Sequence, residues 1–442
     1  MQNNIEQNII LSISLLVSNN IKTIRKCLES LQPLLQAIPS ELIVVDTVGE
    51  KNSDGSLAVV KEYTTHIVPF VWCDDFAAAR NAGLGQAKGE WFLFLDDDEW
   101  FEDTSEIIDF FKTGEYLAYR SATYQIRNYK DRTGTSYSIA ELGRMIKREK
   151  DTKFIGKIHE TFSEIFLPCK AFASFVHHYG YVYDSEEEKQ KHQQRNLKLL
   201  QKELEKNKYD LRYRAQMAME LATFDNERAL KFCEETFKLC ADKKDTPEFQ
   251  WQLALVFRLY EALGVNDIEA DNAYEQLKKV FGYSKTTENA ITYQLARIHI
   301  IFKNYTRAYP YVLQYFETLQ YLKEHKKEQQ LQMVADSSRY QSRECYLEML
   351  EFGAYCGWQS KAYEDAYFFY FQLPWEQEIY YNKESLWYVF QLATEYFDAK
   401  TIFQIIQRVM KNPTMKKEFA SMMHHPVIKE IVAKTMETMR NA

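Results

Sequence analysis

The chain has 442 residues, of which 46% are hydrophobic and 15% aromatic, so it can bury large cores in two or three domains of roughly 150 residues. Its formal charge of -8 argues against a nucleic-acid partner, because neutralising phosphates requires Lys and Arg clustered on one face. No stretch approaches the roughly 20 apolar residues of a membrane helix, which argues against an integral membrane segment.

The seven cysteines are scattered and contain no Cys-x-x-Cys pair. This pattern predicts reduced thiols, a cytoplasmic location and no structural zinc site. The early apolar run 9–17 is interrupted by Ser12 and Ser14 and has no basic residue before it. We therefore predict a strand there rather than a signal peptide.

The first hundred residues alternate short apolar runs with helical patterns. Strands are predicted over 9–17, 41–46, 66–72 and 91–95, and helices over 21–36, 56–63 and from about residue 75 toward 87. Such alternation predicts βαβ units, whose strands are parallel. After Glu102, the Tyr-rich and β-branched segments 116–129, 153–162 and 173–181 predict half-exposed antiparallel strands.

Beyond Asp184 a charged helical segment begins and the β signals nearly vanish, so the predicted domains are 1–190 and 191–442. Helix-turn-helix units are predicted where an alanine follows a short polar turn, at Ala229, Ala273, Ala308 and Ala362. Only the interval between Ala273 and Ala308 approaches the ~34 residues of a tetratricopeptide unit. We therefore expect a degenerate helical array with a concave surface suited to extended peptides. Its aromatic-rich segment 364–382 is either buried core, which we favour, or a homodimer face.

The stretch WFLFLDDDEW, residues 91–100, ends a buried strand with four acidic side chains. Carboxylates this close repel one another and require a cation or hydrogen-bond donors. Mg or Mn beside a nucleotide diphosphate is commonly held by such oxygen ligands. The alternative is a solvated turn that caps the helix starting near Thr104. Because Asp46 ends a second buried strand, both acidic strand ends are expected at one edge of the sheet, which favours the metal site.

The string DDFAAARNAGLGQAKGEWFLFLDDDEW, residues 74–100, resembles family 2 glycosyltransferases of the GT-A fold, and ELIVVDT resembles their uridine-binding strand. The segments RMIKREKDTKFIGKIHET, HHYGY and RNLKLL look more narrowly like the sublancin-type peptide S-glycosyltransferases. This resemblance implies an α/β GT-A domain followed by an all-α domain of tetratricopeptide-like helices. One departure is the turn TVGEKNSDGS, which is longer than the family's turn and leaves the role of Asp54 open.

The resemblance also implies a donor site for a UDP-sugar. Asp46 would accept a hydrogen bond from uracil, while Arg80 and Asn81 would line the nucleotide side. Asp96 would contact the ribose or the water shell of the metal. Asp97 is grouped with these nucleotide-binding residues, although its side chain is expected to point away.

In the same resemblance Asp98 binds Mn or Mg directly, and His178 is a further candidate ligand because neutral imidazole suits Mn. A core histidine is the alternative for His178. Arg195 with Asn196 would close over the diphosphate as a charge clamp, against the alternative of an exposed helical charge.

Members of this family usually invert the anomeric centre, which needs one base to deprotonate the attacking acceptor. His159 and Glu160 are adjacent in a predicted strand, so only one of them is expected to face the donor. We favour Glu160 as the base with His159 second; the alternative is a structural pair. Trp100, Tyr179 and Tyr181 are candidates for stacking on sugar faces, although packing is the more common role of such residues.

The leading hypothesis is a metal-dependent hexosyltransferase that uses a UDP-sugar and a peptide or protein acceptor, through a Cys or a Ser/Thr side chain. A second hypothesis has a lipid or polysaccharide acceptor in cell-envelope synthesis; it ranks lower because no basic amphipathic membrane segment is seen. A third is a non-catalytic nucleotide-binding scaffold. The sequence leaves open which sugar and acceptor are used and which oligomer forms.

Overall fold

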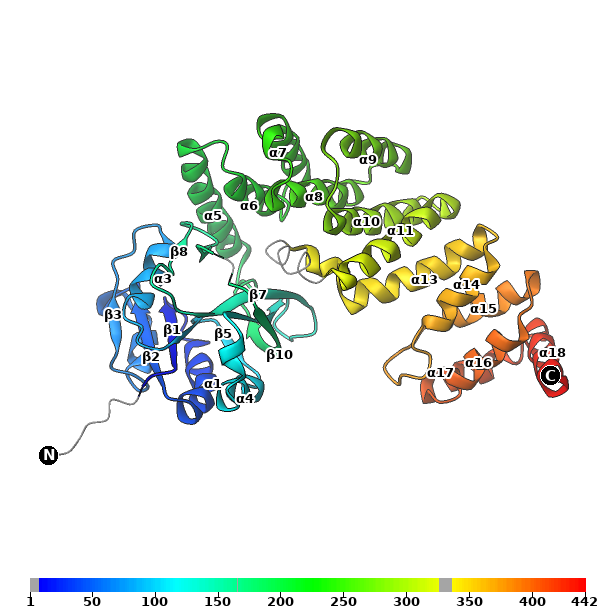
Figure 1. The fold of residues 1–442 in the computed structure, drawn as a ribbon, viewed down its shortest axis with the longest axis horizontal. Helices are drawn as coiled ribbons and strands as arrows, with labels where there is room; N and C mark the ends of the chain where they lie inside the picture. Colours follow the sequence, from blue (N-terminus) through cyan, green and yellow to red (C-terminus); the bar gives the residue numbers. More distant parts are fainter. Residues whose placement is uncertain (1–7, 165, 326–335) are drawn as a thin grey trace. The chain divides into compact units, whose positions relative to one another are not determined.

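The computed structural model describes residues 8–164, 166–325 and 336–442, which form two compact units, 1–220 and 221–442 (Figure 1). The first unit contains the strands and the second is helical. The division after Glu220 falls later than the predicted domain limit at residue 190, because helices α5 (Glu186–Lys206) and α6 (Leu211–Leu221) belong almost wholly to the first unit.

The first unit is built on an eight-stranded sheet in the order β3-β2-β1-β4-β7-β6-β10-β5. The strands that are parallel to one another are β1 (Leu11–Val17), β2 (Ser40–Asp46), β3 (Ile67–Pro69) and β4 (Trp91–Asp96). The others are β5 (Glu99–Phe101), β6 (Ser121–Tyr129), β7 (Tyr137–Lys147) and β10 (Cys169–His178). The strands β8 (Phe154–Ile155) and β9 (Thr161–Phe162) form a separate hairpin.

Helices cover both faces of the parallel strands, which explains why these strands are nearly continuous apolar runs. The helices α1 (Ile24–Ala37) and α4 (Ser105–Lys112) pack on one face through Leu28, Leu31 and Phe110. Helix α3 (Phe76–Leu84) packs on the other face, where Ala79 contacts Leu16. A short helix, α2 (Ser56–Val60), lies between β2 and β3 in the chain. The predicted βαβ alternation is therefore confirmed.

The predicted antiparallel arrangement after Glu102 is only partly right. Strand β7, which was not predicted, runs antiparallel to both β4 and β6, but β10 pairs with β6 in parallel. Strand β5 was also not predicted; it pairs antiparallel with β10 and places His178 opposite Glu99.

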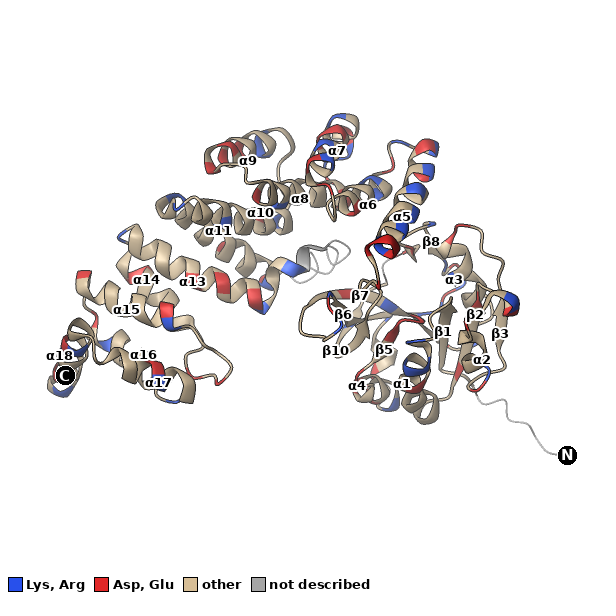
Figure 2. Ribbon diagram, turned by 180° about the vertical axis from the view of Figure 1, so that it is seen from behind, with Lys and Arg blue, Asp and Glu red and all other residues tan. Residues whose placement is uncertain are grey.

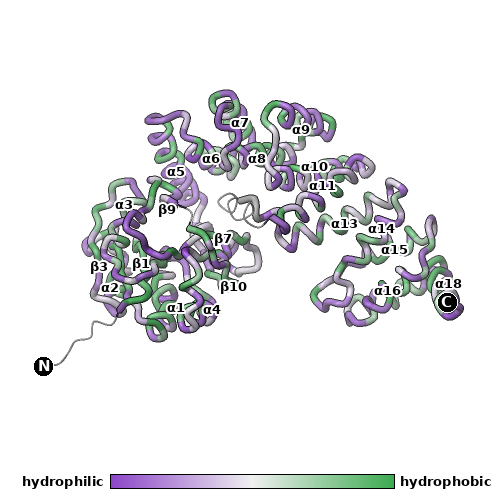
Figure 3. The backbone as a smooth tube through the Cα atoms, in the orientation of Figure 1, coloured by the Kyte–Doolittle hydropathy of each residue, from purple (hydrophilic) through white to green (hydrophobic). Residues whose placement is uncertain are grey.

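The second unit consists of helix pairs, as expected for a degenerate repeat. Its helices are α7 (Asn226–Leu239), α8 (Pro247–Leu263), α9 (Asp267–Phe281), α10 (Lys285–Ile301), α11 (Tyr305–Glu324), α13 (Arg343–Gln359), α14 (Tyr363–Gln372), α15 (Lys383–Glu395), α16 (Ala399–Val409), α17 (Pro413–Met422) and α18 (Pro426–Asn441). Hydrophobic and hydrophilic segments alternate along them (Figure 3). Ala229 and Ala308 are fully buried between helices, whereas Ala273 and Ala362 are half-buried, so the four turns are not equivalent.

The aromatic segment 364–382 contributes mainly to the core of the second unit. Phe369, Tyr370 and Trp375 are buried, while Phe368 and Ile379 are exposed. Along α5 both signs of charge are present (Figure 2), consistent with its charged sequence. None of the described helices has the length and apolarity needed to cross a bilayer.

Candidate active site

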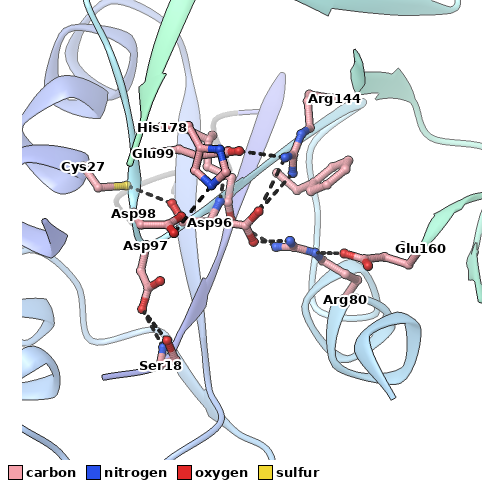
Figure 4. Close-up of polar contacts among 12 residues, drawn as sticks. Ser18, Cys27, Arg80, Asp96, Asp97, Asp98, Glu99, Arg144, Glu160 and His178 are labelled. Atoms are coloured by element: carbon pink, nitrogen blue, oxygen red, sulfur yellow. Dashed lines mark hydrogen bonds and ion pairs between the residues drawn. The ribbon is translucent and has the colours of Figure 1, made fainter. Parts of the chain in front are cut away.

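Four consecutive acidic residues follow the buried part of β4, and their side chains diverge (Figure 4). Asp96 and Glu99 turn toward two arginines, Asp97 turns toward the loop after β1, and Asp98 faces His178. Divergence gives each carboxylate its own donors, which reduces their mutual repulsion. Each acid at the end of β4 therefore contacts a different part of the first unit.

A chain of alternating charges runs through the site in the order Glu160, Arg80, Asp96, Arg144, Glu99. Arg80 Nε donates to Glu160 Oε1 at 2.9 Å, and its Nη2 donates to Asp96. Arg144 Nη2 donates to Glu99 Oε1 at 2.7 Å and lies 3.4 Å from Asp96 Oδ2. Arg80, Arg144 and Glu99 are all buried. Burial by itself raises the pKa of Asp96, but the two guanidinium charges hold this pKa well below its usual range.

Neither Arg144 nor Glu99 is among the site residues expected from the sequence. Arg144 is the first residue of the RMIKREK segment that carried the resemblance, and its guanidinium stacks 4.6 Å from the ring centre of Phe94. In the sequence, Glu99 stands out only as the last residue of the acidic run. Burial raises the pKa of its carboxyl group.

Asp97 points away from the site, as expected for the middle residue. Its Oδ2 accepts from the Ser18 backbone N–H at 2.6 Å, and its Oδ1 accepts from Asn20 Nδ2 at 2.5 Å. Burial, followed by the charge of Asp98, raises the pKa of Asp97 to about 7. These hydrogen bonds tie the end of β4 to the loop after β1, and a nucleotide contact by Asp97 stays a prediction.

Within the acidic run, Asp98 is the residue whose carboxylate faces an imidazole, that of His178. Asp98 Oδ2 lies 3.6 Å from His178 Nε2, and both side chains are partly exposed. The other ring nitrogen, Nδ1, lies 2.6 Å from Asn128 Oδ1, so it carries the proton of that hydrogen bond. Burial by itself lowers the pKa of His178, but Asp98 raises it to about 9. Within the described ranges no group of three or more His, Cys, Asp or Glu side chains is arranged to hold a metal.

Gly180 lies against this pair. A Cβ at Gly180 would collide with His178 Nε2 and lie 2.6 Å from Asp98 Oδ2. The backbone therefore approaches the two side chains as closely as only glycine permits.

At the end of β2, Asp46 is buried and caps its own turn. Its Oδ1 accepts from the backbone N–H groups of Val48 and Gly49 at 3.0 and 2.9 Å. In the longer turn that follows, Asp54 accepts from Ile21 N at 3.0 Å and from Ser56 Oγ at 2.6 Å. Asp54 therefore joins the start of α2 to the loop after β1, which is a structural role.

The candidate residues next to Arg80 and on α5 bind protein groups. Asn81 exchanges hydrogen bonds with the backbone of Phe154 at 2.8 and 3.0 Å, which fixes β8 to α3. Arg195 donates to Asn196 Oδ1 at 3.1 Å, and its guanidinium lies 5.7 Å from the ring centre of Phe76.

The predicted strand at His159 and Glu160 is wrong. Both residues lie in the bend between β8 and β9, where His159 is exposed and has φ +50°. The side chain of Glu160 is 11% exposed and paired with Arg80. The side chains of His159 and Glu160 therefore point in different directions because the chain bends there, and not because they alternate along a strand.

Two of the three candidate stacking residues pack on protein. Trp100 stacks on Tyr179 with ring centres 5.4 Å apart, and Tyr179 stacks on Tyr129 at 4.3 Å. Tyr181 is 52% exposed and lies edge-on to His178 at 5.2 Å. Only Tyr181 thus offers an open ring face beside the Asp98–His178 pair.

Comparison with known proteins identifies a family over most of the first unit. Residues 12–175 match the family model described as glycosyl transferase family 2. The match starts in β1 and ends within β10, and it includes Asp46, Arg80, Asp98 and Glu160. The first unit therefore carries a family 2 glycosyltransferase domain, and the expected fold class, a GT-A domain followed by tetratricopeptide-like helices, is confirmed.

Two curated relatives are similar over part of the chain. A TPR repeat-containing protein of Synechococcus elongatus is 27% identical over 39% of this chain and 43% of its own length. The SPbeta prophage-derived glycosyltransferase SunS of Bacillus subtilis is 28% identical over 34% of each chain. The matched region thus spans less than half of these relatives. A crystal structure of S. aureus TarS 1–349 in complex with UDP-GlcNAc aligns at 13% identity over 67% of this chain and 91% of that chain, with a TM-score of 0.32.

Proposed function

We propose that this chain, whose first unit carries a family 2 glycosyltransferase domain, is a metal-dependent, inverting hexosyltransferase that uses a UDP-sugar donor and a peptide or protein acceptor. The observation that carries the proposal is the Asp98–His178 pair at the carboxyl end of β4. In open α/β sheets ligands bind at this edge. The family match over 12–175 supports the reaction class.

The residues present fit a divalent cation. A carboxylate oxygen and an imidazole nitrogen 3.6 Å apart are spaced as two ligands of one ion can be, since each bond would be about 2.1 Å. The hydrogen bond from His178 Nδ1 to Asn128 leaves Nε2 as the coordinating nitrogen. The remaining ligands would come from diphosphate oxygens and water. Bound there, Mn or Mg would stabilise the charge that develops on the departing diphosphate.

The other donor-side roles follow from the contacts above. Asp46 has a second carboxylate oxygen for the uracil ring while Oδ1 holds the turn. Asp96, fixed between Arg80 and Arg144, would contact the ribose or a metal-bound water. Asn81 acts through β8, and Arg195 would have to exchange its bond to Asn196 for the diphosphate.

On the acceptor side, Glu160 is our candidate base and His159 the second. The ion pair with Arg80 orients the Glu160 carboxylate, whose oxygens could accept a proton from the acceptor. A Cys thiol, with a pKa near 8.5, makes a smaller demand on such a base than a Ser hydroxyl does. The helical unit, whose repeats are suited to extended peptides, is the reason we favour a peptide acceptor.

The test is turnover with defined donors. We would incubate the protein with Mn and UDP-glucose, UDP-galactose or UDP-N-acetylglucosamine, and measure UDP release with and without peptides that contain Cys or Ser/Thr. Release that depends on a peptide, and that is abolished in Asp98→Ala but retained in the exposed α4 control Asp109→Ala, is the expected result. Absence of release with every donor would refute the proposal, and release that requires a lipid or polysaccharide acceptor would replace the peptide.

A further inference from the structure

The bend that carries His159 and Glu160 is held by helix α6, which follows the charged helix α5 in the chain. Arg212, in the first turn of α6, donates from Nη2 to the backbone oxygens of Ile155 at 3.1 Å and His159 at 2.6 Å. These two oxygens belong to residues at opposite ends of the bend. The Arg212 guanidinium therefore links the two ends of the bend.

The bend is shaped to receive this guanidinium. Gly156 has φ +94°, and a Cβ there would overlap the Arg212 guanidinium, with Cζ only 2.7 Å away. His159 has φ +50°, a left-handed conformation that is unfavourable for a residue with a side chain. Two charge-assisted hydrogen bonds to the backbone offset such a cost. Arg212 can therefore hold the bend only because residue 156 is a glycine.

Two further contacts fix the same bend from its sides. The backbone N–H of Lys157 donates to Tyr213 Oη, also on α6, at 3.2 Å. The backbone oxygen of Lys157 accepts from Phe76 N, at the start of α3, at 2.9 Å. The bend is therefore attached both to α6 and to the helix that carries Arg80.

We infer that Arg212 is a positioning residue of the reaction: through the backbone of residues 155–159 it sets where Glu160 meets the acceptor. This inference rests on the proposed function. It makes α6 part of the catalytic apparatus, although the helix lies beyond the region that matches the family model. Arg212 makes its two bonds to backbone oxygens, so its loss is expected to affect the acceptor step and to spare binding of UDP.

The experiment compares Arg212→Met, Gly156→Ala and their double variant in the full chain. Arg25→Met, which removes a partly exposed arginine paired with Glu62 on the surface, is the control for the lost charge. Gly264→Ala controls for backbone strain, because Gly264 has φ +68° but open space around it. The measurements are kcat for peptide-dependent UDP release, the Kd of UDP with Mn, and amide hydrogen exchange of residues 155–160.

We expect Arg212→Met and Gly156→Ala each to lower kcat at least tenfold, to leave the UDP Kd within twofold, and to speed exchange in the bend. The double variant should be no more than twofold slower than the slower single variant, because both changes break the same clamp. Arg212→Lys, which can still reach one oxygen, should give an intermediate kcat. The controls should match the wild type.

A kcat within twofold of wild type in Arg212→Met would overturn the inference. So would a UDP Kd that rises in parallel with the loss of kcat, unchanged exchange in the bend, or multiplying effects in the double variant. If the wild-type protein releases no UDP with any donor, the proposed function itself fails, and that result is visible before any variant is made.

Discussion

Arg144→Met tests whether the buried charge chain stabilises the first unit. Arg144 is 8% exposed and Glu99 only 1%, so Glu99 has little water to replace its partner. The variant breaks the 2.7 Å bond to Glu99 and the weaker contact with Asp96. Removing one partner of a buried pair costs about 3–5 kcal/mol, because the other charge stays buried and uncompensated. For a unit of this size the loss corresponds to a fall in Tm of roughly 6–20 °C.

The second variant, Glu99→Gln in the Arg144→Met background, separates charge from packing. A neutral amide removes the uncompensated charge, and its oxygen can still accept from Asp96 N, as Glu99 Oε2 does at 3.2 Å. We therefore expect it to recover about 1–3 kcal/mol of the loss. Thermal unfolding followed by circular dichroism gives both values. A free energy of unfolding for Arg144→Met within about 1 kcal/mol of wild type, or a double variant no more stable than Arg144→Met, would contradict this stabilising role.

Three further predictions concern the acidic run. The pKa of Asp97 is raised to about 7 in the folded protein and lies near 4 in the unfolded chain, so the free energy of unfolding should fall as the pH rises from about 4 to 7. In urea unfolding, Asp97→Asn should flatten this dependence of stability on pH. An unchanged slope in the variant would contradict the prediction. Asn128→Ala should weaken Mn binding in the presence of UDP about 10–100-fold in calorimetric titration, since it removes the hydrogen bond that orients His178; equal affinity would contradict this role of Asn128. Gly180→Ala should abolish that binding without unfolding the protein, whereas Gly143→Ala, whose methyl meets no atom within 4 Å, should bind normally.

The sequence was sufficient to predict the acidic strand ends because they depend on local rules. A buried apolar run places its last residue at the carboxyl end of a parallel strand, so Asp46, Asp96 and Asp98 could be assigned to one edge of the sheet. The expectation that Asp97 points away came instead from the resemblance to family 2 glycosyltransferases, in which it is the middle residue of the acidic motif. These features need no knowledge of which distant segments meet.

The partners of the acidic run could not be predicted because they come from distant segments. Arg144 lies in β7, whose open and polar sequence gives a weak strand signal, and it meets Asp96 only because β7 inserts beside β4. The pairing of Glu160 with Arg80 depends on the bend between β8 and β9. The sequence pattern had indicated a strand at this position. Helix α5 was assigned to the helical domain from its charge, whereas the compact unit continues to Glu220.

The contacts of the four acids explain why Asp98, and not its neighbours, is the proposed metal ligand. Asp96 and Glu99 are neutralised by Arg80 and Arg144, and Asp97 is held by Ser18 and Asn20. Asp98 therefore presents the one carboxylate of the run that faces a neutral ligand atom when His178 loses its proton. A divalent ion held by one carboxylate and one imidazole keeps a net positive charge, which the anionic diphosphate would balance. Under the proposed function the ion and the nucleotide thus bind cooperatively, since neither finds its full set of partners without the other.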